Sequence, residues 1–379
     1  MKTQKLALSF AVLLLLGSVK LHSQDTIEQV SGECQESKTQ AYLEANQDTL
    51  DLVAVDMTWP REKITEGIMY QLKNLGFLSL TNVSGFNETA LLDAAKWLFN
   101  IDSEDKRKLG QKHHYDGSNN YYRGLAPFIP NDASHKELFD MGMNYSKVSD
   151  FEKQFSLHEE TPFPQGYGQA GTHFKDFMYQ HYEVMHKLGL RVMSHIADGF
   201  GKPTNYFDKW FVNDTCSTMR LIHYLPRSAG VVQSDKLSSD DLKLTTPIHA
   251  DSGFLTLLST FNFPGLQVET EKGVYKSIKP HPNVIVVNIG EMFSRISNYT
   301  LKATLHRVLD IGVERFSSPF FFEPQYSAEI PKNLQEGSAE DDLEGKLIYG
   351  DWLIENMRQF KEFSNFQKTK PSVKQVVQQ

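Results

Sequence analysis

The sequence predicts a mainly β protein with helices, in which a double-stranded β-helix (jelly-roll) core follows an α/β region and is braced by a long helix. Three observations lead to this fold class. Short apolar segments separated by turn residues recur after residue 219, as in folds built from two antiparallel sheets. Strand-like and helical segments alternate between residues 52 and 98. Apolar side chains recur at helical spacing between residues 173 and 200.

The elements of the α/β region follow from the spacing of its apolar residues. Leu52–Asp56 and Phe77–Leu80 are predicted strands. Arg61–Leu75 carries apolar residues three and four positions apart, so we predict a helix that Gly76 ends. A second helix is expected over Asn87–Leu98.

The middle of the chain contains a loop, a strand and the bracing helix. Asp116–Asn131 bears glycine, asparagine and proline and is predicted to be a loop, and Glu137–Gly142 follows as a strand. The helix is predicted over His173–Phe200, with an apolar stripe that faces the core. Three histidines lie on or beside this stripe and form either a second metal site or, as we prefer, ordinary core and surface positions: His181, His186 and His195.

The jelly roll begins with a strand over Met219–Pro226. Arg227–Thr246 is polar and is predicted to be a loop near the entrance of the site. Further strands are expected over Phe254–Ser259 and Leu266–Val268, and Leu347–Phe360 has a helical pattern.

The 379 residues divide into four predicted parts. Residues 1–23 resemble a secretory signal peptide, because Lys2 and Lys5 precede an apolar run that is too short for an ordinary membrane span. A signal anchor or a buried helix is the alternative. Residues 24–165 form the N-terminal α/β region, in which residues 24–46 are polar and expected to be loosely ordered. The jelly-roll core with its helices takes residues 166–365, and a disordered tail takes 366–379.

Five Asn-x-Ser/Thr sequons accompany the signal peptide, which favours a glycosylated protein of the secretory pathway or extracellular space: Asn82, Asn87, Asn144, Asn213 and Asn298. Removing residues 1–23 removes three lysines, so 36 basic residues face 47 acidic ones, a net charge of −11. Such a surface repels nucleic acid and anionic membranes. The expected partner is a small-molecule substrate, and we expect a monomer with no stable membrane span.

The chain has two cysteines, Cys34 and Cys216. An oxidising compartment would allow one disulfide between them, and two unpaired thiols are the alternative. The sequence contains no Cys-x-x-Cys pair, which argues against a zinc ribbon or a thioredoxin-type centre.

His249 and Asp251 are the first two residues of a predicted metal site. Side chains at positions i and i+2 of an extended strand point to the same side, so both can bind one ion. His306 from a later strand would complete a set of two imidazoles and one carboxylate, which leaves open positions on the metal as in non-haem Fe(II) oxygenases. These three residues are the predicted catalytic and metal-binding residues.

Arg315-Phe316-Ser317 stands nine residues after His306 and places a guanidinium and a hydroxyl on one strand face. An arginine fork binds a carboxylate through two parallel hydrogen bonds, and a serine hydroxyl adds another. The pair therefore predicts a clamp for an anionic co-substrate that also chelates the metal.

With these motifs, the chain resembles the 2-oxoglutarate- and Fe(II)-dependent dioxygenases of the isopenicillin N synthase-like superfamily. His249-x-Asp251, His306 and Arg315-x-Ser317 match the family in order and spacing, and the likeness extends over roughly Leu50 to Tyr326. The resemblance implies Fe(II) as the metal, 2-oxoglutarate and O2 as co-substrates, and ascorbate as a candidate reductant. It also implies a tyrosine near the co-substrate, which Tyr224 fits with a shift of one residue.

The implied reaction is hydroxylation of a small organic substrate with release of succinate and CO2, while desaturation and cyclisation are related outcomes. The resemblance further makes Tyr122, Arg123 and Phe139 candidate substrate contacts, although we prefer a packing role for them. Two alternatives stay open: an Fe(II) oxidase of the same fold that needs no 2-oxoglutarate, and a secreted binding protein on this scaffold. A zinc hydrolase is weaker, since there is no His-Glu-x-x-His motif.

Overall fold

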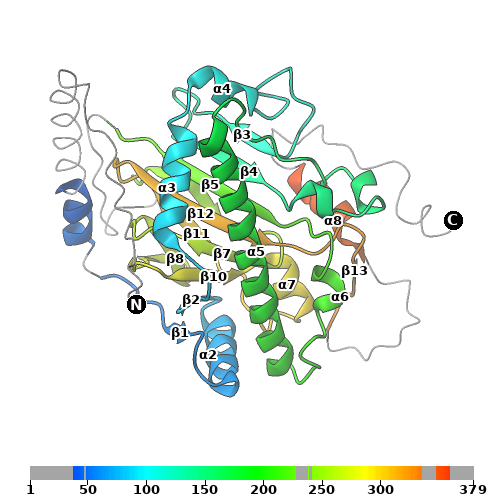
Figure 1. Cartoon of the computed structure of the whole chain (residues 1–379). Helices are drawn as coiled ribbons and strands as arrows, with labels where there is room; N and C mark the ends of the chain where they lie inside the picture. The colour runs from blue at the N-terminus through cyan, green and yellow to red at the C-terminus, as the bar shows by residue number, and fades with distance from the viewer. Residues whose placement is uncertain (1–36, 47, 228–237, 239–240, 335–346, 359–379) are drawn as a thin grey trace, which may run out of the picture.

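The computed structural model describes residues 37–46, 48–227, 238, 241–334 and 347–358. Its strands form a larger sheet of eight and a smaller sheet of four, ordered β1-β2-β10-β7-β12-β5-β4-β3 and β6-β11-β8-β9. Helices α3 and α5 lie across one face of the larger sheet (Figure 1). This arrangement confirms the predicted jelly-roll fold with helices. The predicted signal peptide, Cys34 and the predicted tail lie outside the described residues.

The N-terminal elements lie where the apolar spacing predicts them: β1 (Ala54–Asp56), α2 (Arg61–Asn74), β2 (Phe77–Thr81) and α3 (Glu88–Phe99). The Asn87 side chain accepts a hydrogen bond from the amide of Ala90 at 3.0 Å and so caps α3. A short helix that the sequence analysis missed, α4 (Ser103–Lys108), follows; it has no buried residue and therefore no apolar pattern.

Residues 37–45 are helical, which corrects the expectation that the whole segment 24–46 is loosely ordered. The helix is held by a single aromatic anchor. Tyr42 is 1% exposed, packs with Leu309 and Val313, and shares a 2.7 Å hydrogen bond with the hydroxyl of Ser277. Tyr42 and Leu43 alone, in an otherwise polar segment, were too weak a pattern to predict this helix.

Two strands from the N-terminal region join the edge of the larger sheet: β3 (Gly124–Ala126) and β4 (Lys136–Met141). β4 confirms a predicted strand. β3 falls inside the predicted loop Asp116–Asn131 and corrects that part of it, because three residues suffice to pair with β4. Strands from both predicted regions, 24–165 and 166–365, therefore hydrogen-bond in one sheet.

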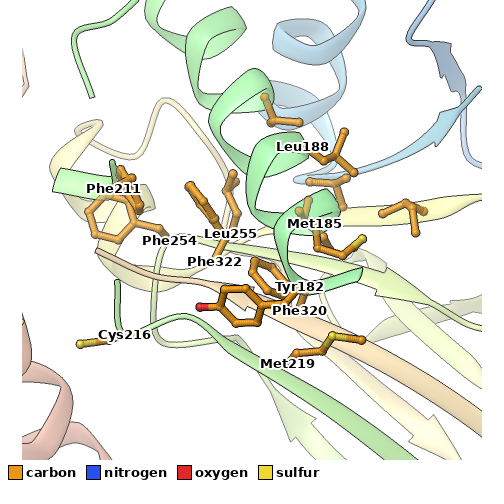
Figure 2. Packing of buried hydrophobic residues seen from close by; sticks show 14 of the residues in the cluster. Tyr182, Met185, Leu188, Phe211, Cys216, Met219, Phe254, Leu255, Phe320 and Phe322 are labelled. Carbon is orange, nitrogen blue, oxygen red and sulfur yellow. The ribbon is translucent and has the colours of Figure 1, made fainter. Parts of the chain in front are cut away.

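The long helix is α5 (Gly168–Gly199), with the short α6 (Asp208–Phe211) after it. Tyr182 of α5 lies against Phe320 of the larger sheet (Figure 2), and His186 of α5 lies beside Phe322. The rings of Tyr182 and Phe320 lie 5.0 Å apart, edge to face. The stripe therefore braces the sheet as predicted. None of the helices in the described part is long and apolar enough to cross a membrane.

The core strands and their helix follow in order: β5 (Thr218–Tyr224), β6 (Leu244–His249), β7 (Leu255–Ser259), β8 (Leu266–Glu271), β9 (Val274–Ser277), β10 (Ile285–Ile289), α7 (Glu291–Ile296), β11 (His306–Leu309) and β12 (Arg315–Phe322). The end of the predicted loop Arg227–Thr246 is in fact the start of β6. Beyond β12, β13 (Glu329–Ile330) pairs with β14 (Leu347–Ile348), so the predicted helix begins only at α8 (Tyr349–Met357).

The two faces of the larger sheet have different roles. Side chains alternate between the two faces along each strand, so the position of a residue in its strand tells which face it occupies. Phe320 and Phe322 of β12 pack on α5, so Arg315, Ser317 and Phe321 point to the opposite face. That face looks towards the smaller sheet, because the Arg315 guanidinium contacts the hydroxyl of Thr245 on β6. We call it the inner face, and the functional residues lie on it.

Candidate metal centre and co-substrate clamp

His249, Asp251 and His306 converge, and their nearest ligand atoms all lie within 4.8 Å of one another. Asp251 Oδ1 is 3.6 Å from His249 Nε2 and 3.8 Å from His306 Nε2. The two histidines are direct partners in the antiparallel pairing of β6 with β11, and their ring centroids are 4.2 Å apart. No other group of three or more His, Cys, Asp or Glu residues in the described part could hold a metal ion.

Each histidine has one ring nitrogen engaged by the backbone. His249 Nδ1 lies 2.8 Å from the carbonyl oxygen of Pro247, and His306 Nδ1 lies 3.1 Å from that of Thr304. A carbonyl only accepts, so Nδ1 carries the proton in both rings and each Nε2 presents a lone pair. This is the tautomer that binds a metal, with the ring orientation fixed by the second hydrogen bond.

The carboxylate of Asp251 is held in the same way. Its Oδ2 accepts hydrogen bonds from the Thr256 hydroxyl and from Asn288 Nδ2, the latter at 2.8 Å, which leaves Oδ1 turned to the histidines. Burial raises the pKa of Asp251, but the two histidines and these hydrogen bonds outweigh it, so the pKa is lowered overall. Burial and the neighbouring His306 lower the pKa of His249. The site therefore presents an ionised carboxylate beside imidazole lone pairs.

The structure corrects one part of the geometry predicted for this pair. β6 ends at His249, so Asp251 lies in the turn after the strand and not on it. Helix α7 fixes this turn, because amides in its first turn donate to the carbonyl oxygens of Asp251 at 2.7 Å and Ser252 at 2.9 Å. The first amides of a helix lack partners within the helix, and here the turn supplies them.

Arg315, Ser317 and Tyr224 form the predicted clamp on the inner face. Arg315 pairs with Tyr224 across β12 and β5, and its guanidinium carbon lies 3.5 Å from the centre of the tyrosine ring. Arg315 and Ser317 are 5% and 6% exposed. Burial raises the pKa of Tyr224, but Arg315, Lys136 and a hydrogen bond with Ser317 lower it further than burial raises it. Tyr224 thus joins the clamp despite the shifted motif.

Lys136 is a second cation at the clamp, and the sequence analysis missed it. Its ammonium donates to the carbonyl oxygen of Thr245 and to the hydroxyl of Thr246, both at 2.9 Å, and lies 5.7 Å from the centre of the Tyr224 ring. Lys136 lies at the clamp because it is the partner of Tyr224 in the pairing of β4 with β5. A lone lysine at the start of a strand carries no motif that could have revealed it.

The two cations of the clamp have no anionic partner among the described residues. Neither Lys136 nor Arg315 forms an ion pair there. Arg315 is 5% exposed and Lys136 is half-buried, and burial lowers the pKa of each. A buried charge without a counter-charge is costly, so a site with two of them is built to receive an anion. A dicarboxylate is such an anion.

The remaining candidates have packing roles. Phe139 is fully buried and lies edge to face with Phe163, on the helix side of the sheet. Arg123 is 2% exposed and donates to the hydroxyl of Thr218, which also shares a 2.8 Å hydrogen bond with the phenol of Tyr122. These contacts agree with the packing role that the sequence analysis prefers for the three residues.

The three helix histidines are not a second metal site in the described structure. His181 is buried, which lowers its pKa to about 4. His195 shares a 2.8 Å hydrogen bond with the hydroxyl of Thr65 on α2. His186 lies beside Phe322, with ring centroids 5.4 Å apart. His181 and His195 are buried core positions and His186 is half-buried, which agrees with the preferred prediction of ordinary core and surface histidines.

Comparison with known proteins identifies the class. The sequence pattern of the 2OG-Fe(II) oxygenase superfamily matches residues 216–324. The 2-oxoglutarate-dependent dioxygenase citB of Monascus ruber is 31% identical over 274 residues, 69% of this chain and 78% of that protein. Isopenicillin N synthase of Streptomyces clavuligerus is 26% identical over 306 residues, 79% of this chain and 90% of that protein. The chain belongs to the 2OG-Fe(II) oxygenase superfamily and is an Fe(II)/2-oxoglutarate-dependent dioxygenase, an oxidoreductase.

Solved structures agree on the fold. A full-length protein of Neurospora crassa, crystallised with alpha-KG and thymine, superposes with a TM-score of 0.66 at 22% identity, covering 83% of this chain and 98% of that one. Dioxygenase for auxin oxidation 1 of Arabidopsis thaliana, crystallised with 2-oxoglutarate, has a TM-score of 0.56 at 19% identity, covering 76% and 98%. These structures confirm the predicted fold, while the sequence comparisons confirm the predicted family with its Fe(II) and 2-oxoglutarate.

Proposed function

We propose that this enzyme hydroxylates a small organic substrate and converts 2-oxoglutarate to succinate and CO2 in the same turnover. The observation that carries the proposal is the convergence of two metal-ready imidazoles and one ionised carboxylate beside an anion site with two buried cations. The donor set fits Fe(II), because two histidines and one carboxylate on one face leave positions for the co-substrates.

In this proposal His249, Asp251 and His306 bind the iron. Bound iron supplies the oxidising chemistry together with O2 and the keto acid. The hydrogen bonds to Pro247 and Thr304 fix the histidine tautomers, and Asn288 directs one carboxylate oxygen to the metal side. These contacts support a site whose ligand atoms already face one another before a metal binds.

Arg315, Ser317 and Tyr224 hold the far carboxylate of 2-oxoglutarate, and Lys136 adds a second positive charge. The planar guanidinium is already oriented by its stacking on Tyr224, so little side-chain freedom is lost on binding. Arg315 reaches Thr245 on β6, the strand that ends at His249, so the clamp and the metal lie at opposite ends of one short stretch of chain.

A 2-oxoglutarate-independent oxidase is the second candidate, because isopenicillin N synthase is among the relatives. In that case the clamp would bind a carboxylate of the substrate. A secreted binding protein is disfavoured by the intact ligand set. The ratio of succinate formed to product formed, measured with the Fe(II)-loaded full chain, separates these candidates. We expect a ratio of one, whereas product without succinate would exclude our proposal.

The substrate itself is the open part of the proposal. The Neurospora crassa protein was crystallised with thymine, and the Arabidopsis relative is named for auxin oxidation, so small cyclic compounds are the first to test. Incubation with a metabolite extract, followed by mass spectrometry for one added oxygen or two lost hydrogens, distinguishes hydroxylation from desaturation or cyclisation.

We also propose that the enzyme enters the secretory pathway. The support is the N-terminal signal-like sequence and the exposure of four of the five sequon asparagines: Asn82, Asn87, Asn213 and Asn298. Asn144 is half-buried.

A further inference from the structure

His223 of β5 lies between two carboxylates on the outer face of the larger sheet, the face that packs on α5. Its Nδ1 is 2.9 Å from Oε1 of Glu137 on β4, and its Nε2 is 2.8 Å from Oε1 of Glu314, the residue before β12. The ring stacks on Phe316 with centroids 4.6 Å apart and planes at 6°, and the ring of Phe99 on α3 is 5.4 Å away. The imidazole is therefore held on both edges and both faces.

This bridge of two carboxylates and one imidazole is built from the chain neighbours of the clamp residues. Three clamp residues form one cross-strand row over β4, β5 and β12: Lys136, Tyr224 and Arg315. Each of them is adjacent in sequence to one member of the bridge, in the order Glu137, His223 and Glu314. Neighbouring residues in a strand point to opposite faces, so the bridge ties the three strands together directly behind the clamp.

The geometry requires both nitrogens of the ring to donate. An ionised carboxylate only accepts and a neutral imidazole has one N–H, so only the protonated ring satisfies both partners. Burial lowers the pKa of His223, but the hydrogen bonds with Glu137 and Glu314 outweigh it, so the pKa is raised overall above its ordinary value of 6.5. In the described structure these two carboxylates are the charged groups that face the ring, and Lys106 of α4 lies behind Glu137 at 3.2 Å.

The two carboxylates differ in their response to the loss of a ring proton. The Glu137 side chain is 8% exposed and keeps Lys106 as a partner, whereas that of Glu314 is 40% exposed and can be solvated. A neutral ring therefore keeps its bond with Glu137 and gives up Glu314. Because Glu314 is joined through the main chain to Arg315, its release loosens the start of β12, which carries the guanidinium of the clamp.

We infer that His223 is a positioning residue of the clamp, which joins β4, β5 and β12 through Glu137 and Glu314 while it is protonated, and that its deprotonation weakens the binding of 2-oxoglutarate. The inference rests on the proposed function, since it takes the clamp as the co-substrate site. Iron binding should not follow the same titration, because the proposed iron ligands lie on β6, on β11 and in the turn after β6.

The test measures the Kd of 2-oxoglutarate by equilibrium dialysis against the Fe(II)-loaded full chain without oxygen, at about pH 6 and about pH 8.5. We expect the wild-type Kd to be at least about fivefold higher at the higher pH, and a smaller change would overturn the inference. Lys136 and Tyr224 also have shifted pKa values, so variants are needed to assign the change to the bridge.

Glu314→Gln is the decisive variant. Its amide oxygen accepts from the protonated ring and its amide nitrogen donates to the neutral ring, so the bridge is kept at both pH values. We expect a near wild-type Kd at the lower pH and a pH-dependent change less than about half that of the wild type. Glu183→Gln is the matched control, because Glu183 is 44% exposed and pairs with Lys147; it should keep the wild-type change. A change in Glu314→Gln above that limit would exclude His223 as its source.

The same samples separate this inference from the proposed function. Iron content is measured in each, and Glu314→Gln should hold as much iron as the wild type at each pH; less iron would mean a general disturbance and overturn the positioning role. If 2-oxoglutarate binds at neither pH, the proposed co-substrate and the inference fail together. If it binds with the same pH dependence in the wild type and in Glu314→Gln, only the role of His223 fails.

Discussion

Each proposed iron ligand is oriented by a hydrogen bond on its far side. Pro247 and Thr304 leave the two Nε2 atoms free, and Asn288 engages the second oxygen of Asp251. Such partners hold a site in its binding geometry before the metal arrives. Single substitutions of the ligands should therefore remove the metal without removing the fold.

The first prediction concerns the metal. Asp251→Ala in the purified chain should lower iron binding at least a hundredfold, because the only anionic ligand is lost, while the circular dichroism spectrum stays that of the wild type. His281→Ala is the matched control, since His281 is a partly exposed histidine that contacts Asp51. Iron is quantified after anaerobic dialysis. Wild-type iron content in the Asp251 variant would refute the ligand assignment.

The second prediction concerns the clamp. Arg315→Lys keeps the charge but loses the fork, so the KM for 2-oxoglutarate should rise more than tenfold, about 1.4 kcal/mol, with kcat less affected. Lys136→Met should raise the same KM by removing the second cation. Lys106→Met is a suitable control, because Lys106 is half-buried and pairs with Glu137 away from the clamp. An unchanged KM in both clamp variants would place the co-substrate elsewhere.

At the scale of elements, the larger sheet depends on close contact with α5. Gly189 lies where α5 meets β12, and a Cβ atom there would stand 2.4 Å from the ring of Phe322, which is fully buried. Interiors are close-packed, so the ring has little room to move. The glycine is kept in the middle of a helix because its hydrogen atom is the only side chain that fits.

Gly189→Ala should consequently destabilise the protein by roughly 1 to 3 kcal/mol, despite the higher helix propensity of alanine. Gly171→Ala on the same helix is the control, since its nearest neighbour to a new Cβ is 3.3 Å away. That variant should stay near the wild type. Urea unfolding followed by circular dichroism measures both. A neutral or stabilising Gly189→Ala would mean that α5 and β12 are less tightly packed than described.

A second contact between elements joins β12, the Asp251 turn and α8. Glu323 accepts a hydrogen bond from the phenol of Tyr349 and lies against Gly253. Burial raises its pKa to about 8, and Asp251 contributes in the same direction. The carboxyl group is therefore protonated in the folded protein at neutral pH, whereas it ionises near pH 4.5 in the unfolded chain.

The sign of the pH dependence follows from these two values. Between about pH 4.5 and 8 the folded state binds a proton that the unfolded state does not, so the free energy of unfolding falls as pH rises. The slope contributed by this group is about 1.4 kcal/mol per pH unit in the middle of this range. Glu323→Gln should remove it, and the variant should gain stability relative to the wild type from pH 5 to 8. Urea titrations at each pH, with Glu62→Gln as an exposed control, test this; parallel curves would contradict it.

At the scale of the whole molecule, the proposal of entry into the secretory pathway predicts a glycosylated protein. Expression of the full chain in a eukaryotic secretory system should yield a protein whose mass falls on treatment with peptide N-glycosidase. Asn298→Gln, at an exposed turn after α7, should reduce the mass by one glycan, whereas the half-buried Asn144 should contribute little. A protein of unchanged mass that stays in the cytosol would end the proposal.

Local patterns made much of the fold predictable. The apolar spacing in α2 and α5 and the segments that became β2, β4 and β5 identify elements with one buried face. The sequence analysis missed α4, which buries no residue, and β3, whose three residues are too few to show an apolar pattern. The helix around Tyr42 was missed because its packing, through Tyr42 and Leu43, is with residues far along the chain.

The sequence by itself determined the chemistry of the site, because His249, Asp251, His306, Arg315 and Ser317 carry their ligand atoms and spacing in the chain order. The tertiary structure decided which residues surround them. Lys136 lies opposite Tyr224, and Asn288 donates to Asp251, only because strand pairing and the alternation of strand side chains bring these distant residues together. Burial was likewise decided by the fold, and burial is what turns ordinary side chains such as Glu323 into shifted acids.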